Sequence, residues 1–136
     1  MQVWPKNILV DAGPLIALGR KSDKHHGRAL AFAATCQSRM ISSWVVVAEA
    51  AHFLDSRQRV NIYRMLEDGF LHLEDVRDSD ATRLIEITQK YPQADLADAT
   101  LVVLAERLGL TDIATLDKTD FAVYRTKTGK HFNNFF

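Results

Sequence analysis

The sequence predicts a single α/β domain of three layers, with helices on both faces of a short, mostly parallel central sheet. Three observations support this prediction. Short apolar runs alternate with longer helical patterns, and parallel strands need such crossover helices between them. The chain has 136 residues, the size of one domain, so we expect one domain over residues 1–136. The composition, 47% hydrophobic and 25% charged, is that of a folded globular protein.

The first half of the chain is expected to contain two strands and three helices. The strands are predicted over residues 8–10 and 40–41, and the helices over residues 15–19, 23–37 and 44–56. The first strand stops at Ala12-Gly13-Pro14, which is typical of a turn. Asp23 is the expected N-cap of the second helix, and Ser42 or Ser43 that of the third.

The second half continues the alternation. Strands are predicted over residues 70–73, 112–116 and 121–124, and helices over residues 58–68, 79–91 and 96–108. Gly69 and Gly109 are suited to end the helices before them, because glycine adopts a left-handed backbone without strain. Pro92 ends another helix, since the residue before a proline disfavours helical geometry.

Four carboxylates lie in apolar stretches where a core would favour hydrophobic side chains: Asp11, Glu49, Asp98 and Asp117. A buried carboxylate is costly unless it is paired, protonated or bound to a metal. Four that approached one another would also repel. A shared divalent cation resolves both costs, so the pattern favours a metal-dependent enzyme.

The predicted elements bring these acids toward one place. Asp11 and Asp117 follow apolar runs at the carboxyl ends of two strands, where ligands bind in open parallel sheets. Glu49 and Asp98 share helix faces with apolar residues at positions three and four away. Asp95 lies three residues before Asp98, where it fits a helix N-cap as well as a metal ligand.

Charge and cysteine content limit the remaining classes of protein. Seventeen basic residues balance seventeen acidic ones, so net charge neither favours nor excludes nucleic acid as a partner. A single cysteine, Cys36, cannot form an internal disulfide, which fits a reducing cytoplasm. Residues 1–6 lack the pattern of a signal peptide, and no apolar run has the length of a membrane span. We therefore expect a cytoplasmic protein with no membrane segment.

These motifs together resemble the PIN-domain family, compact α/β nucleases that include the VapC-type toxins of toxin–antitoxin pairs. The resemblance extends over essentially the whole chain and rests on residues 10–18 (VDAGPLIAL), 43–50 (SWVVVAEA), 96–99 (LADA) and 115–121 (TLDKTDF). It implies a PIN-like fold and hydrolysis of RNA phosphodiester bonds at a cluster of acids that binds Mg²⁺ or Mn²⁺.

The resemblance also assigns roles to residues of this chain. It implies Asp11 as the central metal ligand, with Glu49, Asp98 and Asp117 around it, and Asp95 and Asp120 as further candidates. If the chain is a toxin, a small antitoxin protein should cover the acidic groove. A homodimer is the default expectation for a small chain of this kind.

The sequence departs from the family at one position. Many relatives have a hydroxyl residue directly after the first aspartate, whereas this chain has Ala12-Gly13. A hydroxyl that would orient the Asp11 carboxylate is therefore missing from that place. Thr115, Ser42 and Ser43 are the candidates to replace it.

Basic side chains are the expected contacts to RNA. The candidates are basic residues near the first loop and in the C-terminal segment: Arg20, Arg125, Lys127 and Lys130. The C-terminal bases alternate with phenylalanines, a mixture that single-stranded RNA favours, but the same phenylalanines could instead cover the core. For His25, His26 and His52, ordinary structural roles on their helices are favoured over catalytic ones.

Two other classes of function compete with the nuclease. A PIN-like module could bind RNA or metal without cleaving it, although all four acids expected of an active member are present. An aspartate-dependent phosphatase would need a second aspartate two residues after the first, and Gly13 stands at that position. The order of acids also differs from that of a phosphotransfer receiver.

Overall fold

The computed structural model describes residues 3–136. The prediction that residues 1–6 are not a signal peptide falls in part on residues 1 and 2, which lie outside the described residues. In the described chain, five short strands form one parallel sheet of order β3-β2-β1-β4-β5. The strands are β1 (Asn7–Val10), β2 (Arg39–Ser42), β3 (Leu71–Leu73), β4 (Asp112–Ala114) and β5 (Asn133–Asn134). The predicted parallel sheet is confirmed.

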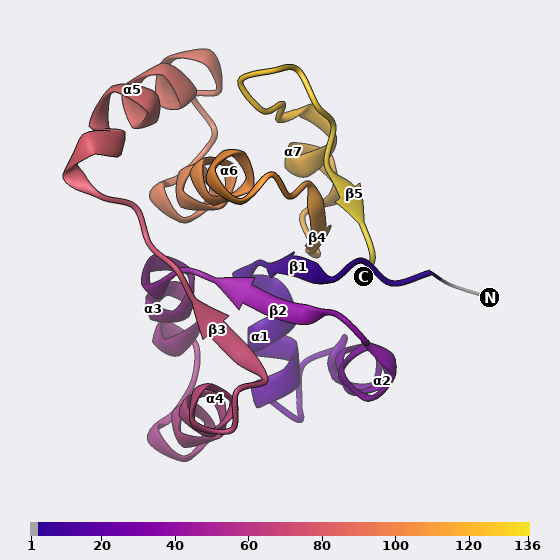
Figure 1. Cartoon of the computed structure of the whole chain (residues 1–136). Helices are drawn as coiled ribbons and strands as arrows, with labels where there is room; N and C mark the ends of the chain where they lie inside the picture. The colour runs from indigo at the N-terminus through magenta and orange to yellow at the C-terminus, as the bar shows by residue number, and fades with distance from the viewer. Residues whose placement is uncertain (1–2) are drawn as a thin grey trace.

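Helices cover both faces of the sheet, which confirms the three-layer prediction. They are α1 (Ala12–Gly19), α2 (His26–Thr35), α3 (Trp44–His52), α4 (Ser56–Glu67), α5 (Ala81–Lys90), α6 (Leu96–Leu108) and α7 (Lys118–Val123). Figure 1 shows α1, α2 and α4 in the lower part of the molecule and α5, α6 and α7 in the upper part. Helix α3 packs against both α1 and α6 and so joins the two layers. No helix between residues 3 and 136 is both long and apolar enough to cross a membrane.

The strand order creates a switch point between β1 and β4. From β1 the chain proceeds to β2 and β3 on one side, and then returns to β4 and β5 on the other. Val10 pairs with Ala114, and the Asp11 amide donates to the Ala114 carbonyl at 3.0 Å. The residues that follow β1 and β4 therefore meet at one end of the sheet, where crevices form in folds of this class.

Helix α6 lies in the middle of the upper layer. Residues 97–105 are all buried, so the helix is enclosed on every side, and two of these buried residues, Asp98 and Thr100, are polar. The helix ends at Gly109, whose φ of +63° requires the left-handed geometry that glycine favours. The predicted bounds of 96–108 are confirmed.

The prediction of a strand over residues 121–124 is wrong. This segment belongs to α7, and the fifth strand lies later in the chain, at β5. Phe121 and Tyr124 are buried while the two residues between them are exposed, a helical spacing of three. Their aromatic composition favoured a strand, whereas β5 has only two exposed asparagines and offers no apolar signal.

Capping side chains explain three further differences. Helix α1 begins at Ala12 rather than at residue 15, because Asp11 caps it and Pro14 is tolerated in a first helical turn. The N-cap prediction for Asp23 is wrong: α2 begins at His26, and Asp23 accepts instead from the His25 amide in the preceding turn. Helix α3 ends at His52 instead of residue 56, because Asp55 caps the next helix.

Candidate metal centre

An open cleft of about 540 Å³ lies at the switch point of the sheet. All six carboxylates named from the sequence line it: Asp11, Glu49, Asp95, Asp98, Asp117 and Asp120. They come from the ends of β1 and β4, from α3 and from the starts of α6 and α7. Residues more than 100 positions apart in the sequence thus face one space.

Three of these acids are close enough to share one cation. One carboxylate oxygen from each of Asp98, Asp117 and Asp120 lies within 4.8 Å of the other two. Oxygen ligands lie about 2.1 Å from Mg²⁺, so two on opposite sides are about 4.2 Å apart. Small side-chain shifts would therefore close this triad around a hard divalent ion. These oxygen donors fit the implied Mg²⁺ or Mn²⁺. Asp120 belongs to the triad of close acids, whereas Glu49 lines the same cleft outside the triad.

Asp11 is held rigidly at the end of β1. One carboxylate oxygen accepts from the Ala12 amide and the other from the Thr115 hydroxyl, each at 2.8 Å. Burial raises the pKa of Asp11, and these two hydrogen bonds work in the opposite direction. Thr115 therefore supplies the hydroxyl that is missing after Asp11, whereas Ser42 and Ser43 bond elsewhere.

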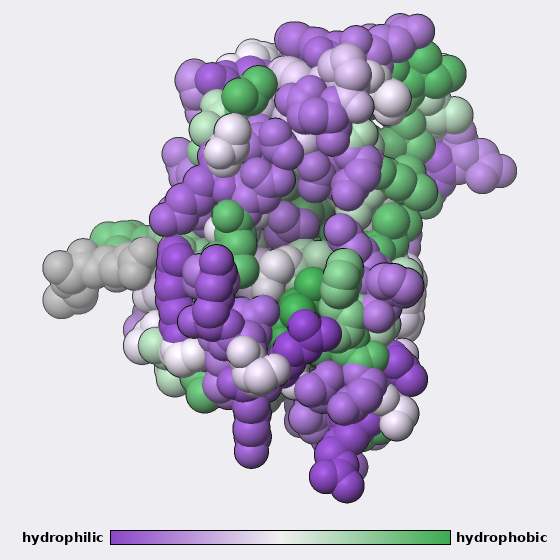
Figure 2. All heavy atoms as spheres, turned by 180° about the vertical axis from the view of Figure 1, so that it is seen from behind, coloured by the Kyte–Doolittle hydropathy of each residue, from purple (hydrophilic) through white to green (hydrophobic). Residues whose placement is uncertain are grey.

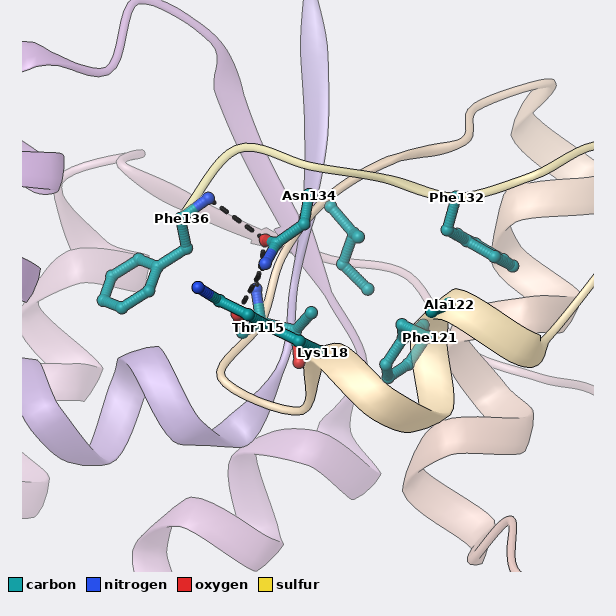
Figure 3. A pocket seen from close by; sticks show the side chains of 8 residues that line it. Thr115, Lys118, Phe121, Ala122, Phe132, Asn134 and Phe136 are labelled. Carbon is teal, nitrogen blue, oxygen red and sulfur yellow. Dashed lines mark hydrogen bonds between the residues drawn. The ribbon is translucent and has the colours of Figure 1, made fainter.

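Thr115 is itself fixed by the C-terminal strand. Its amide donates to Asn134 Oδ1, and Asn134 Nδ2 donates to its carbonyl, both at 3.1 Å (Figure 3). Its hydroxyl also accepts from the Asp117 amide at 2.9 Å. A pocket of about 320 Å³ lies beside this contact and is lined by Lys118 and three phenylalanines. Thr115 thus connects Asp11, Asp117 and the edge of the sheet.

Asp98 is a buried acid whose ionisation is strongly perturbed. Only 8% of the residue is exposed, and burial, together with the charges of nearby aspartates, raises its pKa to about 7. The Tyr124 hydroxyl donates to Asp98 Oδ2 at 2.7 Å and partly offsets this shift. Tyr124 was not predicted as a site residue, and only its spacing of three from Phe121 could have indicated that it faces inward.

The remaining acids combine capping with their place in the cleft. Asp95 accepts from the Asp98 amide at 2.8 Å, which confirms its N-cap interpretation, and Asp117 accepts from the Asp120 amide at 3.0 Å. The contact with Asp117 raises the pKa of Asp120. Burial and then the charges of Asp95 and Asp11 raise the pKa of Glu49. Mutual repulsion of this kind is what a bound cation would relieve.

The predicted RNA-binding residues lie outside the lining of the cleft. The Arg20 side chain donates to the Phe53 carbonyl, and Arg125 donates to three carbonyls at the end of α7. Lys127 and Lys130 line a separate pocket of about 260 Å³ near Gly109. The C-terminal phenylalanines contact other aromatic rings and pack against the core, which favours the core-covering alternative for them.

The histidines lie outside the lining of the cleft as well. His26 Nδ1 is 2.7 Å from the Ala17 carbonyl and joins α2 to α1. His25 is the residue before α2, and His52 packs edge-on against Phe53 at 5.3 Å between ring centroids. These positions agree with the structural roles expected for them.

Residues 8–127 match the family model described as the PIN domain. A crystal structure of VapC20 from Mycobacterium tuberculosis, described as a toxin that cleaves the sarcin–ricin loop, is similar to this chain. The sequence identity is 21%, with a TM-score of 0.73, over 82% of this chain and 91% of VapC20. No curated protein matches the sequence. The family match spans most of the chain and contains all six cleft acids, and the chain therefore belongs to the PIN domain family.

Proposed function

We propose that this protein is a divalent-metal-dependent endoribonuclease and the toxin of a toxin–antitoxin pair, acting in the cytoplasm. The observation that carries the proposal is the convergence of six carboxylates in one cleft of a PIN domain. Similarity in fold to VapC20, described as an RNA-cleaving toxin, supports the choice of RNA as substrate.

Each acid of the cleft has a role in this proposal. Asp11, Glu49, Asp98 and Asp117 hold Mg²⁺ or Mn²⁺, with Asp120 and Asp95 as additional members of the acidic wall. Thr115 and Tyr124 orient two of these carboxylates through their hydroxyls. The cation would supply Lewis-acid stabilisation of the phosphate and of the attacking water.

The expected reaction is hydrolysis of one RNA phosphodiester bond. A water oxygen forms a bond to phosphorus while the bond from phosphorus to the 3′ oxygen breaks, and that oxygen takes up a proton. The products carry a 5′-phosphate and a 3′-hydroxyl. The open form of the cleft leaves room for a strand of RNA to reach the acids.

The experiment that tests the proposal is cleavage of purified tRNA, rRNA and single-stranded RNA with Mg²⁺ or Mn²⁺, and with a chelator. Asp11→Asn and Asp98→Asn should each abolish cleavage. Glu67→Gln, an acid at the exposed end of α4, is the matched control and should cleave like the wild type. RNA binding without cleavage by metal-loaded wild-type protein would favour the binding-module alternative and contradict the nuclease proposal.

We also propose that Arg20, Arg125, Lys127 and Lys130 contact the RNA backbone. Lys127 and Lys130 have exposed side chains and line one pocket, so they are the accessible members of this set. Replacing both with alanine should weaken binding of RNA to the Asp11→Asn variant uniformly across sequences. It should also lower the slope of affinity against salt by about 1 for each lost phosphate contact.

Exposed apolar side chains on α3 and α4 support a protein partner. Trp44, Phe53 and Tyr63 are 55%, 49% and 46% exposed. In Figure 2, hydrophobic residues interrupt the largely hydrophilic rear face in its middle and along one side. Large exposed apolar surfaces commonly mark interaction sites. We propose that a small antitoxin and a second copy of the chain are the partners.

Partner binding has its own test. Expression of the wild-type chain alone should arrest growth, and expression of Asp98→Asn should not. Light scattering of the purified protein should give the mass of a dimer. A monomeric mass would contradict the homodimer, and harmless expression of an active nuclease would contradict the toxin role.

A further inference from the structure

One buried hydrogen bond joins the two helices that carry the tight triad of acids. The Tyr124 hydroxyl, just after α7, donates to Asp98 Oδ2 on α6 at 2.7 Å. Asp117 is the N-cap of α7 and Asp120 lies in its first turn, so the same short segment carries two acids and the tyrosine. The bond therefore fixes the distance between Asp98 and its two partners.

We propose that Tyr124 is a positioning residue that sets the metal affinity of the cleft by locking the Asp98 carboxylate in one orientation. The inference rests on the metal site of the proposed function and adds a residue that does not itself line the cleft. Hydrogen-bond partners of metal ligands restrict the ligands' orientation and commonly change affinity by about 10- to 100-fold when removed.

The bond also determines which oxygen remains for a cation. Oδ2 accepts from Tyr124, while Asp98 Oδ1 has no hydrogen bond with any described residue, and Asp98 lines the cleft. Among residues 3–136, no buried side-chain oxygen or nitrogen lacks a partner, so Oδ1 is reached from the open side. Oδ1 is therefore the oxygen of Asp98 that is left with both lone pairs for a cation.

Packing holds the tyrosine ring independently of its hydroxyl. Tyr124 is 0% exposed and makes edge-on contacts with the rings of Tyr91 and Phe121, with centroids 5.1 and 5.0 Å away. Tyr124→Phe keeps these ring contacts and removes only the bond to Asp98. The variant therefore separates positioning of the carboxylate from support of the fold.

Tyr91→Phe is the matched control. It removes a hydroxyl from the same aromatic cluster, where the Tyr91 oxygen accepts from the Arg125 amide at 3.1 Å and has no hydrogen bond to an acid among the described residues. It perturbs packing and backbone bonding near α7 without changing the bond to Asp98. Its effect therefore measures what a structural role alone would do.

Calorimetry of Mn²⁺ binding to the wild type, both tyrosine variants and Asp98→Asn tests the proposal, with thermal unfolding measured alongside. Tyr124→Phe should bind Mn²⁺ about tenfold more weakly, and Tyr91→Phe should bind it like the wild type. For cleavage of RNA, Tyr124→Phe should lower kcat and leave KM unchanged.

Two results would overturn the role of Tyr124 while leaving the metal site intact. One is that Tyr124→Phe binds Mn²⁺ with wild-type affinity while Asp98→Asn has lost Mn²⁺ binding. The other is an equal loss in both tyrosine variants, because the cluster would then act through folding. Unchanged Mn²⁺ binding in Asp98→Asn would instead contradict the metal site of the proposed function.

Discussion

The carboxylates of the cleft depend on hydroxyl groups supplied by distant parts of the chain. Thr115 follows β4 and orients Asp11, and Tyr124 follows α7 and orients Asp98. Each hydroxyl occupies one carboxylate oxygen and leaves the group ionisable. Individual hydroxyl residues thus determine the orientation of the carboxylates in the cleft.

Replacement of Thr115 by valine should weaken both the fold and the metal site. Valine has nearly the same shape but cannot donate to Asp11 or accept from the Asp117 amide. Loss of a buried partner costs about 1–3 kcal/mol in the free energy of unfolding, and Mn²⁺ affinity should fall about tenfold. Urea unfolding and calorimetry measure the two effects. Thr115→Ser keeps the hydroxyl and should retain most of both properties.

The raised pKa of Asp98 predicts an unusual dependence of stability on pH. In the metal-free protein, this pKa is about 7 in the folded state against 3.8 in an ordinary carboxyl. Between these values the folded chain holds a proton that the unfolded chain has released. The Asp98 contribution to the free energy of unfolding is therefore largest at the acidic end and falls as pH rises through about 7.

The Asp98→Asn variant isolates this contribution. Urea unfolding of metal-free protein across that pH window should show a smaller decline in the variant, because asparagine has no proton to lose. The pKa values of Asp11 and Glu49 are raised in the same direction, so some decline should remain. Identical slopes in the two proteins would contradict the assignment.

At the scale of elements, helix starts place acids in the cleft. Asp11, Asp95 and Asp117 precede α1, α6 and α7 and accept from amides of their first turns. A side chain that caps a helix has a fixed position, and a helix N-terminus also favours negative charge. The hydroxyl oxygens of the buried residues Ser43 and Thr100 lie 2.9 Å apart. This hydrogen bond connects the start of α3, the helix that carries Glu49, to α6.

Two substitutions of Asp95 separate its cap from its charge. Asparagine caps helices as well as aspartate does, whereas Asp95→Ala should cost about 1 kcal/mol in the free energy of unfolding. We expect Asp95→Asn to keep the wild-type free energy of unfolding and to bind Mn²⁺ with an affinity within about threefold of the wild type, because the role of Asp95 is mainly to cap α6. A loss of Mn²⁺ affinity as large as that of Asp98→Asn would assign Asp95 as a ligand instead.

At the scale of the whole molecule, the cleft joins both layers and both halves of the sheet. A cation bound there would contact residues from the ends of β1 and β4 and from α6 and α7. Binding to the folded state alone should stabilise the protein by about 2.7 kcal/mol at a metal concentration 100 times the Kd.

Thermal unfolding with Mn²⁺ and with a chelator measures this stabilisation. The midpoint of the wild type should rise with Mn²⁺, and the midpoint of Asp11→Asn should rise less, because one ligand has lost its charge. Glu67→Gln, outside the cleft, should respond like the wild type. An equal rise in Asp11→Asn would locate the stabilising ion elsewhere on the protein.

The sequence by itself determined the elements with strong local signals. Helix α6 has an aspartate cap and a terminal glycine, and β1 is an apolar run followed by an acid, so their positions followed from short-range chemistry. The apolar run before Asp117 also located β4, which ends at Ala114 rather than at the predicted residue 116. Four acids of the cleft were also named from their apolar surroundings, Asp95 from its spacing to Asp98, and Asp120 from the family resemblance. By contrast, the prediction of a strand over residues 121–124 was wrong, because α7 has only six residues and so short a segment gives an ambiguous pattern.

Only the tertiary structure decided which groups meet. Asp98 meets Asp117 and Asp120 because the segment of α7 packs beside α6, and the strand order brings Asp11, at the end of β1, to the same end of the sheet as β4. The partners of the acids, Thr115 for Asp11 and Tyr124 for Asp98, are 104 and 26 residues away in the chain. Contacts at such separations leave no local trace in a sequence, because neither the helical nor the strand period relates the two residues.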